Sequence, residues 1–305
     1  MFNKQVLLVI LFLFSVIGCH PSMIELDSVD SLDQAHSKPY FEIPDLKPHQ
    51  SMAFYDDKGV FIVPSKNNLI CDIYDLNSKE LLSSLLLPTE NYSIPHANTS
   101  CFGNDLFSEN SVFPPLYVSS WNHGRQAFVY DISSNGRTYL CSLLQVIDPS
   151  NVSEDIIGSG YLDWVVDADS NHYLYSLAYH IKGSSRVSKD NCIHVTKFRL
   201  PPLIGKKVML TNADVEDSFT VPVMTVFQDK CISRGHLYVV AGASDDNYLY
   251  PTRLFDIDVN TRIVNERRLP FNGEPEGFCF YNTERWLNMY GSSRIYSIER
   301  LFKLK

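Results

Sequence analysis

The sequence contains none of the short motifs that mark the common nucleotide-binding and hydrolytic folds. It has no GxSxG nucleophile elbow, no P-loop and no GxGxxG dinucleotide fingerprint. Its seven cysteines include no CxxC pair. Most of the six that follow Cys19 lie in apolar, strand-like runs, where a free cysteine behaves as a small hydrophobic residue. We therefore expect buried free thiols, and the motifs leave the chemistry of the protein open.

Basic residues are also scarce. Lysine and arginine number 26 against 35 aspartates and glutamates, which gives a formal net charge of −9. Nucleic-acid phosphates favour basic patches, so this balance argues against a nucleic-acid partner. At 45% hydrophobic and 12% aromatic residues, the chain still has ample apolar surface to fold as one globular body.

The chain has one long apolar run, residues 6–17, which is too short to span a bilayer, since that needs roughly 20 apolar residues. Lys4 precedes the run, and VIGC at 16–19 ends it. This ending resembles the lipobox of bacterial lipoproteins. The resemblance implies a signal peptide at 1–18, lipidation of Cys19 and a polar, acidic tether at 19–37. His20 stands where an aspartate would favour the inner membrane, so we expect the outer membrane of a Gram-negative bacterium.

Helical periodicity is almost absent beyond the tether. Short β-branched and aromatic runs alternate with Asn, Asp, Gly and Ser, which is typical of antiparallel strands. One pattern occurs three times, as IYDLNSKELL at 73–82, VYDISSNGRTYL at 129–140 and LFDIDVNTRIV at 254–264. Each copy predicts a hairpin, and a further hairpin precedes each. Four antiparallel strands per repeat predict an all-β protein, a single β-propeller domain at 38–305.

The spacing of the repeats predicts the number of blades. Comparable inner strands begin near Met52, Ala97, Asp163, Asp229 and Gly277, at intervals of 45, 66, 66 and 48 residues. A blade takes about 40–50 residues, so an interval of 66 is one blade with long loops. Five blades fit best, and six remain the alternative. The last repeat lacks its fourth strand, and PYFEIPD at 39–45 has no hairpin partner. We expect this N-terminal strand to complete the last blade and close the ring.

The segments that lead into the inner strands carry the candidate site. Loops before the first strands of a propeller share one face around the central channel, and a pocket ringed by polar groups is the default ligand site. The same groups could instead hydrogen-bond neighbouring blades. The candidate ligand-binding residues are His49, Gln50, His96, Asn98, Asp163, Gln228, Asp229, Glu274 and Glu276.

Three of these residues also suggest a catalytic alternative. Asp163, Asp229 and Glu276 resemble the inner-strand carboxylates of five-bladed glycoside hydrolases, which need two carboxylates at a defined separation. EPEGF at 274–278 resembles a segment of several propeller families, some calcium-dependent and hydrolytic, so the resemblance allows a calcium ion. A hydrolase acting on glycosides, esters or phosphoesters is therefore the second hypothesis.

Lipobox, tether and divergent propeller together resemble the uncharacterised TolB-like or six-bladed propeller lipoproteins of Bacteroidetes. That resemblance implies a membrane-anchored module outside the cytoplasm and no defined activity. Since no catalytic motif is present, the first hypothesis is a binding or scaffolding module. We expect a monomer, attached to the membrane through Cys19, whose ligand is a small molecule, a glycan or a protein.

Overall fold

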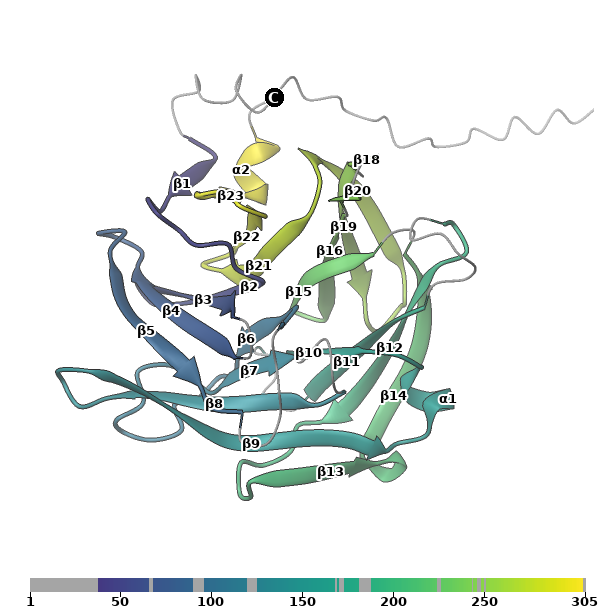
Figure 1. The fold of residues 1–305 in the computed structure, drawn as a ribbon. Coiled ribbons are helices and arrows are strands. Elements are labelled where there is room, and N and C mark those ends of the chain that lie inside the picture. Colours follow the sequence, from purple (N-terminus) through teal and green to yellow (C-terminus); the bar gives the residue numbers. More distant parts are fainter. Residues whose placement is uncertain are drawn as a thin grey trace, which may run out of the picture.

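In the residues that the computed structural model describes, four four-stranded sheets and one five-stranded sheet stand as blades around a common axis (Figure 1). The described residues are 38–65, 68–89, 96–119, 125–167, 169, 173–180, 188–223, 226–242, 244–245, 248–249 and 251–303. The five-bladed β-propeller is thus confirmed, and the six-bladed alternative is wrong. Cys19, the signal peptide and the tether lie outside the described residues. Within these, no helix is long and apolar enough to cross a membrane.

The blades follow one another along the chain. Blade 1 contains β2 (Ser51–Tyr55), β3 (Lys58–Pro64), β4 (Leu69–Asp75) and β5 (Leu81–Leu87). Blade 2 contains β6 (Ser100–Phe102), β7 (Leu116–Ser119), β8 (Ala127–Ser134) and β9 (Tyr139–Asn151). Blade 3 contains β10 (Leu162–Val166), β11 (Tyr173–His180), β12 (Cys192–Arg199) and β14 (Val215–Pro222).

Blade 4 contains β15 (Phe227–Ser233), β16 (His236–Ala241), β19 (Pro251–Asp258) and β20 (Val264–Asn272). Blade 5 contains β21 (Pro275–Tyr281), β22 (Glu284–Met289), β23 (Arg294–Ser297) and β1 (Tyr40–Glu42). The strands β17 (Ser244–Asp245) and β18 (Tyr248–Leu249) form a small ladder between β16 and β19. Short helices are α1 (Glu154–Ile157), η2 (Asn212–Asp214) and α2 (Ile298–Leu301).

The aspartate that ends the third strand of blades 1 and 4 has a local structural role. Asp75 accepts hydrogen bonds from the backbone N–H groups of Asn77 and Ser78, at 2.8 and 2.7 Å. Asp258 accepts from the N–H groups of Asn260 and Thr261 in the same way, at 2.8 and 3.0 Å. An aspartate in this position builds the tight turn between the third and fourth strands of a blade. In blade 2, Asn135 makes the corresponding turn instead.

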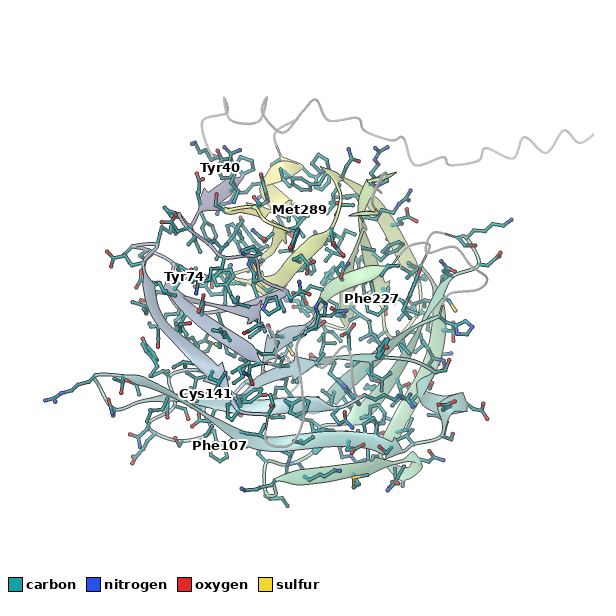
Figure 2. All side chains as sticks on the ribbon, in the orientation of Figure 1. Tyr40, Tyr74, Phe107, Cys141, Phe227 and Met289 are labelled. Atoms are coloured by element: carbon teal, nitrogen blue, oxygen red, sulfur yellow. The ribbon has the colours of Figure 1, made fainter. Side chains whose placement is uncertain are left out.

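The N-terminal strand closes the ring as expected. β1 pairs antiparallel with β23, with Tyr40 opposite Tyr296, so the purple and yellow ends of the chain lie side by side in Figure 1. The Ser297 N–H donates to the Pro39 carbonyl at 2.7 Å. Tyr40, labelled on β1 in Figure 2, is buried with its ring 5.5 Å from that of Tyr296. The pairing covers an edge strand that would otherwise expose its backbone groups.

One strand departs from the repeat. β13 (Lys207–Thr211) lies between β12 and β14 in the chain, yet it pairs parallel with the outer strand β9 of blade 2. The Gln145 side chain holds the preceding loop by donating to the carbonyls of Pro202 and Gly205, each at 3.0 Å. The 66-residue interval before Asp229 is therefore one blade whose loop reinforces its neighbour.

Candidate functional site

The five inner strands, β2, β6, β10, β15 and β21, begin at the same end of the channel, and a cavity of about 350 Å³ opens there. Four of the five blades contribute to it. The structure brings together six of the nine candidate ligand-binding residues in its lining: His96, Asn98, Asp163, Gln228, Glu274 and Glu276.

The other three candidates are buried and do not line this cavity. His49 and Gln50 are 2% and 6% exposed, and Asp229 is fully buried. The His49 ring packs edge-on against Phe61 with 4.9 Å between centroids. On its other side, a Cβ added at Gly277 would lie 2.9 Å from His49 Nε2, so glycine lets β21 pass close to the ring. Burial lowers the pKa of His49 to about 4, and the ring is neutral at neutral pH.

Asp229 is the centre of a buried hydrogen-bond network that we call the hub. Its Oδ2 accepts from Ser51 Oγ on β2 at 2.9 Å and from the Phe278 N–H on β21 at 2.8 Å. Its Oδ1 accepts from the Lys230 N–H at 2.8 Å. Ser51 Oγ in turn accepts from the Ser100 N–H on β6 at 2.6 Å. One carboxyl group thus connects blades 1, 2, 4 and 5.

Lys230 adds the remaining blade to the hub. It is fully buried, and its Nζ donates to Asp163 Oδ2 on β10 at 2.5 Å. The ammonium also lies 4.3 Å from the centre of the Phe227 ring. Desolvation lowers the pKa of Lys230 and raises those of Asp163 and Asp229, the last to about 8, while the mutual attraction of the charges opposes both effects. All five inner strands share one network, which consists of Ser51, Ser100, Asp163, Asp229, Lys230 and the Phe278 N–H.

Glu276 lines the cavity and takes no part in the hub. It is 4% exposed and has no hydrogen-bond partner within the described residues. Burial raises its pKa to about 9, and the charges of Glu274 and Asp229 add to this effect. Its side chain therefore holds a proton at neutral pH. Glu274, by contrast, accepts a hydrogen bond from Gln228 Nε2 at 2.5 Å.

Two acceptor atoms of the cavity have no hydrogen-bond partner within the described residues, although the Asn98 side chain interacts with the Asp163 carboxyl group and opposes the rise of its pKa. Asp163 gives one carboxyl oxygen to Lys230, and its Oδ1 has no partner. Asn98 Oδ1 is likewise buried and unpartnered. Burial lowers the pKa of His96, so this ring is neutral at neutral pH. Buried polar atoms normally find a partner, so these acceptors suit a ligand that donates hydrogen bonds.

Aromatic side chains form the rest of the wall, and the loop-based sequence argument missed them. They are Tyr161, Tyr179 and Phe227, the last labelled in Figure 2. Tyr179 and Phe227 meet edge-on at 5.5 Å, whereas Tyr161 is 51% exposed. Tyr161 and Phe227 directly precede or begin an inner strand, which is a usable signal. Tyr179 ends a second strand, and the sequence carries no sign that it faces the channel.

The described residues offer no support for a bound metal. Among them, no group of three or more His, Cys, Asp and Glu side chains is arranged to hold an ion. The calcium site suggested by EPEGF therefore has no ligand set in this part of the chain, where Asp229 is enclosed by the hub, Asp163 is paired with Lys230 and Glu274 accepts from Gln228.

A second, smaller pocket of about 180 Å³ lies at the other end of the inner strands. Cys101, Cys231 and Cys279 line it, and burial raises the pKa of each thiol, that of Cys101 to about 12. All six cysteines of the described part are free. Protonated thiols are poor nucleophiles and metal ligands, so this end of the channel is chemically quiet.

The hub predicts a large loss of stability when Asp229 is removed. Asp229→Ala leaves Ser51, the Phe278 N–H and the buried Lys230 without their shared partner, and we expect the free energy of unfolding to fall by about 3–5 kcal/mol. Asp229→Asn keeps an acceptor oxygen and should cost about half as much. Urea denaturation measures both. Asp190→Ala, at an exposed position, is the control and should change stability by less than ~0.5 kcal/mol. Equal effects at Asp229 and Asp190 would show that the hub is not essential.

The raised pKa of Glu276 predicts how stability depends on pH. The folded state binds this proton more tightly than the unfolded chain, so its contribution to stability is lost as pH rises from about 4.5 to 9. Between pH 7 and 9 His49 and His96 stay neutral, but Asp229, whose pKa is about 8, titrates as well. Of the loss of stability in this range, we expect about 2 kcal/mol to come from Glu276. Glu276→Gln should remove that part of the slope in urea denaturation, whereas the exposed Glu109→Gln should leave the slope unchanged. A wild-type slope in Glu276→Gln would contradict the assignment.

No protein-family model and no curated protein matches this chain. Among solved structures, it is similar to an exo-β-1,3-galactanase from Phanerochaete chrysosporium, with 9% identity and a TM-score of 0.49 over 85% of this chain and 64% of that one. The chain thus spans less than two thirds of the galactanase. A β-1,3-galactosidase matches at 8% identity and a TM-score of 0.44 over 85% of this chain and 92% of that one. TolB from Acinetobacter baumannii matches at 11% identity and a TM-score of 0.37, over 76% and 46% of the two chains. At these scores the likenesses carry no argument about substrate or mechanism.

Proposed function

We propose that this chain is a membrane-anchored binding module outside the cytoplasm, and that a small polar ligand occupies the cavity at the channel mouth. The observation that carries the proposal is the composition of that cavity. Four blades supply its polar lining, aromatic rings form its wall, and Asp163 Oδ1 and Asn98 Oδ1 have no hydrogen-bond partner among the described residues. A concave site with a few convergent polar groups on an apolar wall is the usual form of a ligand pocket.

The state of the carboxyl groups favours binding over hydrolysis. Glycoside hydrolysis by two carboxyl groups needs one as acid and the other as base or nucleophile. Asp163 is paired with Lys230, and Asp229 is enclosed by the hub. Glu276 could therefore act as the acid. Glu274, the remaining carboxyl group of the cavity, already accepts a hydrogen bond from Gln228, so no carboxyl group among the described residues is free to act as the base or nucleophile.

A hydrolase of glycosides, esters or phosphoesters is the second candidate, and one observation favours it. Glu276 keeps its proton at neutral pH because its pKa is about 9, which is the property of a general acid. Glu274 of the same strand segment would then have to exchange its hydrogen bond with Gln228 for the role of base.

The binding proposal is tested on the purified full chain with a panel of neutral sugars, amino sugars, amino acids and alkyl amines. We expect at least one compound to raise the melting temperature and to give a saturable calorimetric titration. Tyr161→Ala should weaken that binding about tenfold or more, because it removes an aromatic wall without disturbing the core. Phe107→Ala, an exposed ring labelled far from the channel in Figure 2, should leave it unchanged.

Two results would contradict the binding proposal. One is the failure of every compound to bind, and the other is binding that Tyr161→Ala leaves intact. Turnover of nitrophenyl glycosides or esters that Glu276→Gln abolishes would instead move the hydrolase ahead.

The anchor is tested separately at Cys19. The lipobox-like VIGC supports lipidation there, so the wild type made in a Gram-negative host should partition into the detergent phase of Triton X-114. Cys19→Ser should move to the aqueous phase, whereas Cys192→Ser, which alters a half-buried thiol on β12, should not. Equal partitioning of wild type and Cys19→Ser would remove the proposed anchor.

A further inference from the structure

The channel-mouth cavity has an excess of hydrogen-bond acceptors. Asp163 Oδ1 and Asn98 Oδ1 are buried without a partner, and Glu276 is 96% buried without one within the described residues. Each such acceptor costs free energy unless a donor reaches it. A ligand that carries several N–H groups would satisfy them together.

The charge of the cavity has one sign. Asp163, Glu274 and Glu276 line it, and none of its described lining residues is a lysine or arginine. Lys230 lies outside the lining and is already paired with Asp163. An anionic ligand would meet three carboxyl groups and, among the described lining residues, no lysine or arginine, so repulsion and desolvation oppose it. A cation is the ligand that this lining stabilises.

The aromatic wall of the cavity favours organic cations over metal ions. The rings of Tyr161, Tyr179 and Phe227 offer apolar surface and π-faces, which attract organic cations. A metal ion instead needs several oxygen or nitrogen ligands around it, and the described residues contain no such group. The site therefore suits an ammonium group on an apolar body.

We propose that the ligand is a protonated primary amine, whose ammonium group lies among the acceptors of Asp163, Asn98 and Glu276 while its apolar part packs on Tyr161, Tyr179 and Phe227. This inference rests on the proposed binding function and specifies its ligand. The primary amine is preferred to a quaternary one because it donates three hydrogen bonds.

Binding of such a cation is coupled to a proton on Glu276. The charges of Glu274, on its own segment, and of Asp229, on β15, act on this group, and Asp163 and neutral His96 line the same cavity. Lys230 is paired with Asp163, and neutral His49 lies close to the adjacent Gly277. Below its pKa of about 9, Glu276 holds a proton that an incoming ammonium group displaces. Affinity should therefore rise with pH, by up to about tenfold per unit between pH 6.5 and 8.5.

The experiment compares three probes on the purified full chain by isothermal titration calorimetry. 2-Phenylethylammonium has charge and N–H donors, its N-trimethyl derivative has charge alone, and 2-phenylethanol has neither charge nor N–H groups. We expect affinities in that order, with at least tenfold between the first and the last. Titrations in two buffers of different ionisation enthalpy should show proton release on binding of the first two probes.

Matched variants assign the effect to the cavity. Glu276→Gln should abolish proton release and the rise of affinity with pH, and it should reduce 2-phenylethylammonium affinity at pH 8.5 by about tenfold or more. Glu109→Gln should behave as wild type, because that side chain is exposed elsewhere. Tyr161→Ala, which removes a half-exposed ring, should weaken the binding of both cations. This second variant tests the site without changing Glu276.

The outcomes separate this inference from the proposed function. Equal affinity for 2-phenylethanol and 2-phenylethylammonium would contradict the proposal that the ligand is an amine. Cation binding that neither Glu276→Gln nor Tyr161→Ala weakens would contradict it as well. If neutral sugars of the panel bind in a Tyr161-dependent way and no amine does, the inference fails while the binding module stands. If nothing binds, both fail.

Discussion

The burial of one charged network governs the arrangement of this propeller. Each inner strand brings its first residues to the centre, where water is scarce and a polar group needs a protein partner. Asp229 meets that requirement for four blades by accepting from Ser51 and from the N–H groups of Phe278 and Lys230. The Lys230–Asp163 pair supplies the fifth. Because buried ion pairs are costly to desolvate, the value of this hub lies less in net stability than in the relative positions that it imposes on the strands.

The hub also divides the channel into two chemically different ends. Asp163 lines the acceptor-rich cavity at the mouth, whereas Ser100 and Phe278 line the small pocket that contains three thiols. Desolvation acts on both ends, but with different consequences. At the far end it keeps the thiols protonated and inert. At the mouth it leaves Glu276 protonated in a cavity wide enough for a ligand, so its proton can be exchanged for an external positive charge.

The local rules explain why the fold was predictable and the site only partly so. Asp75 and Asp258 bind backbone N–H groups of the turn that follows them, so the turn can be predicted from the sequence. The missing fourth strand of the last repeat predicts that β1 completes that blade. The parallel pairing of β13 depends on a neighbouring blade, so the hydrophobic pattern of its own segment could not predict it.

Polar residues at the start of the inner strands predicted six lining residues, because a propeller places those positions at one end of its channel. Whether such a residue faces the cavity or the hub depends on side-chain partners from other blades, which is why Asp229 and Glu276 could not be told apart. FQDKC at 227–231 did carry a signal in its lysine, since a lysine inside an apolar strand needs a buried acid.

The balance of acidic and basic groups connects the hub with the kind of ligand that the cavity binds. Within the described residues, Lys230 is the cation closest to the site, and its Nζ is committed to Asp163. The acids of the channel mouth therefore outnumber the bases that can neutralise them, and the protein resolves the excess by protonating Glu276. Protonation removes the charge, but Asp163 Oδ1 and Asn98 Oδ1 have no hydrogen-bond partner within the described residues. A bound ammonium group would do both at once, because it brings positive charge and several N–H donors into the same volume. Because Lys230 is already paired with Asp163, an ammonium group for the remaining acceptors would have to come from the ligand.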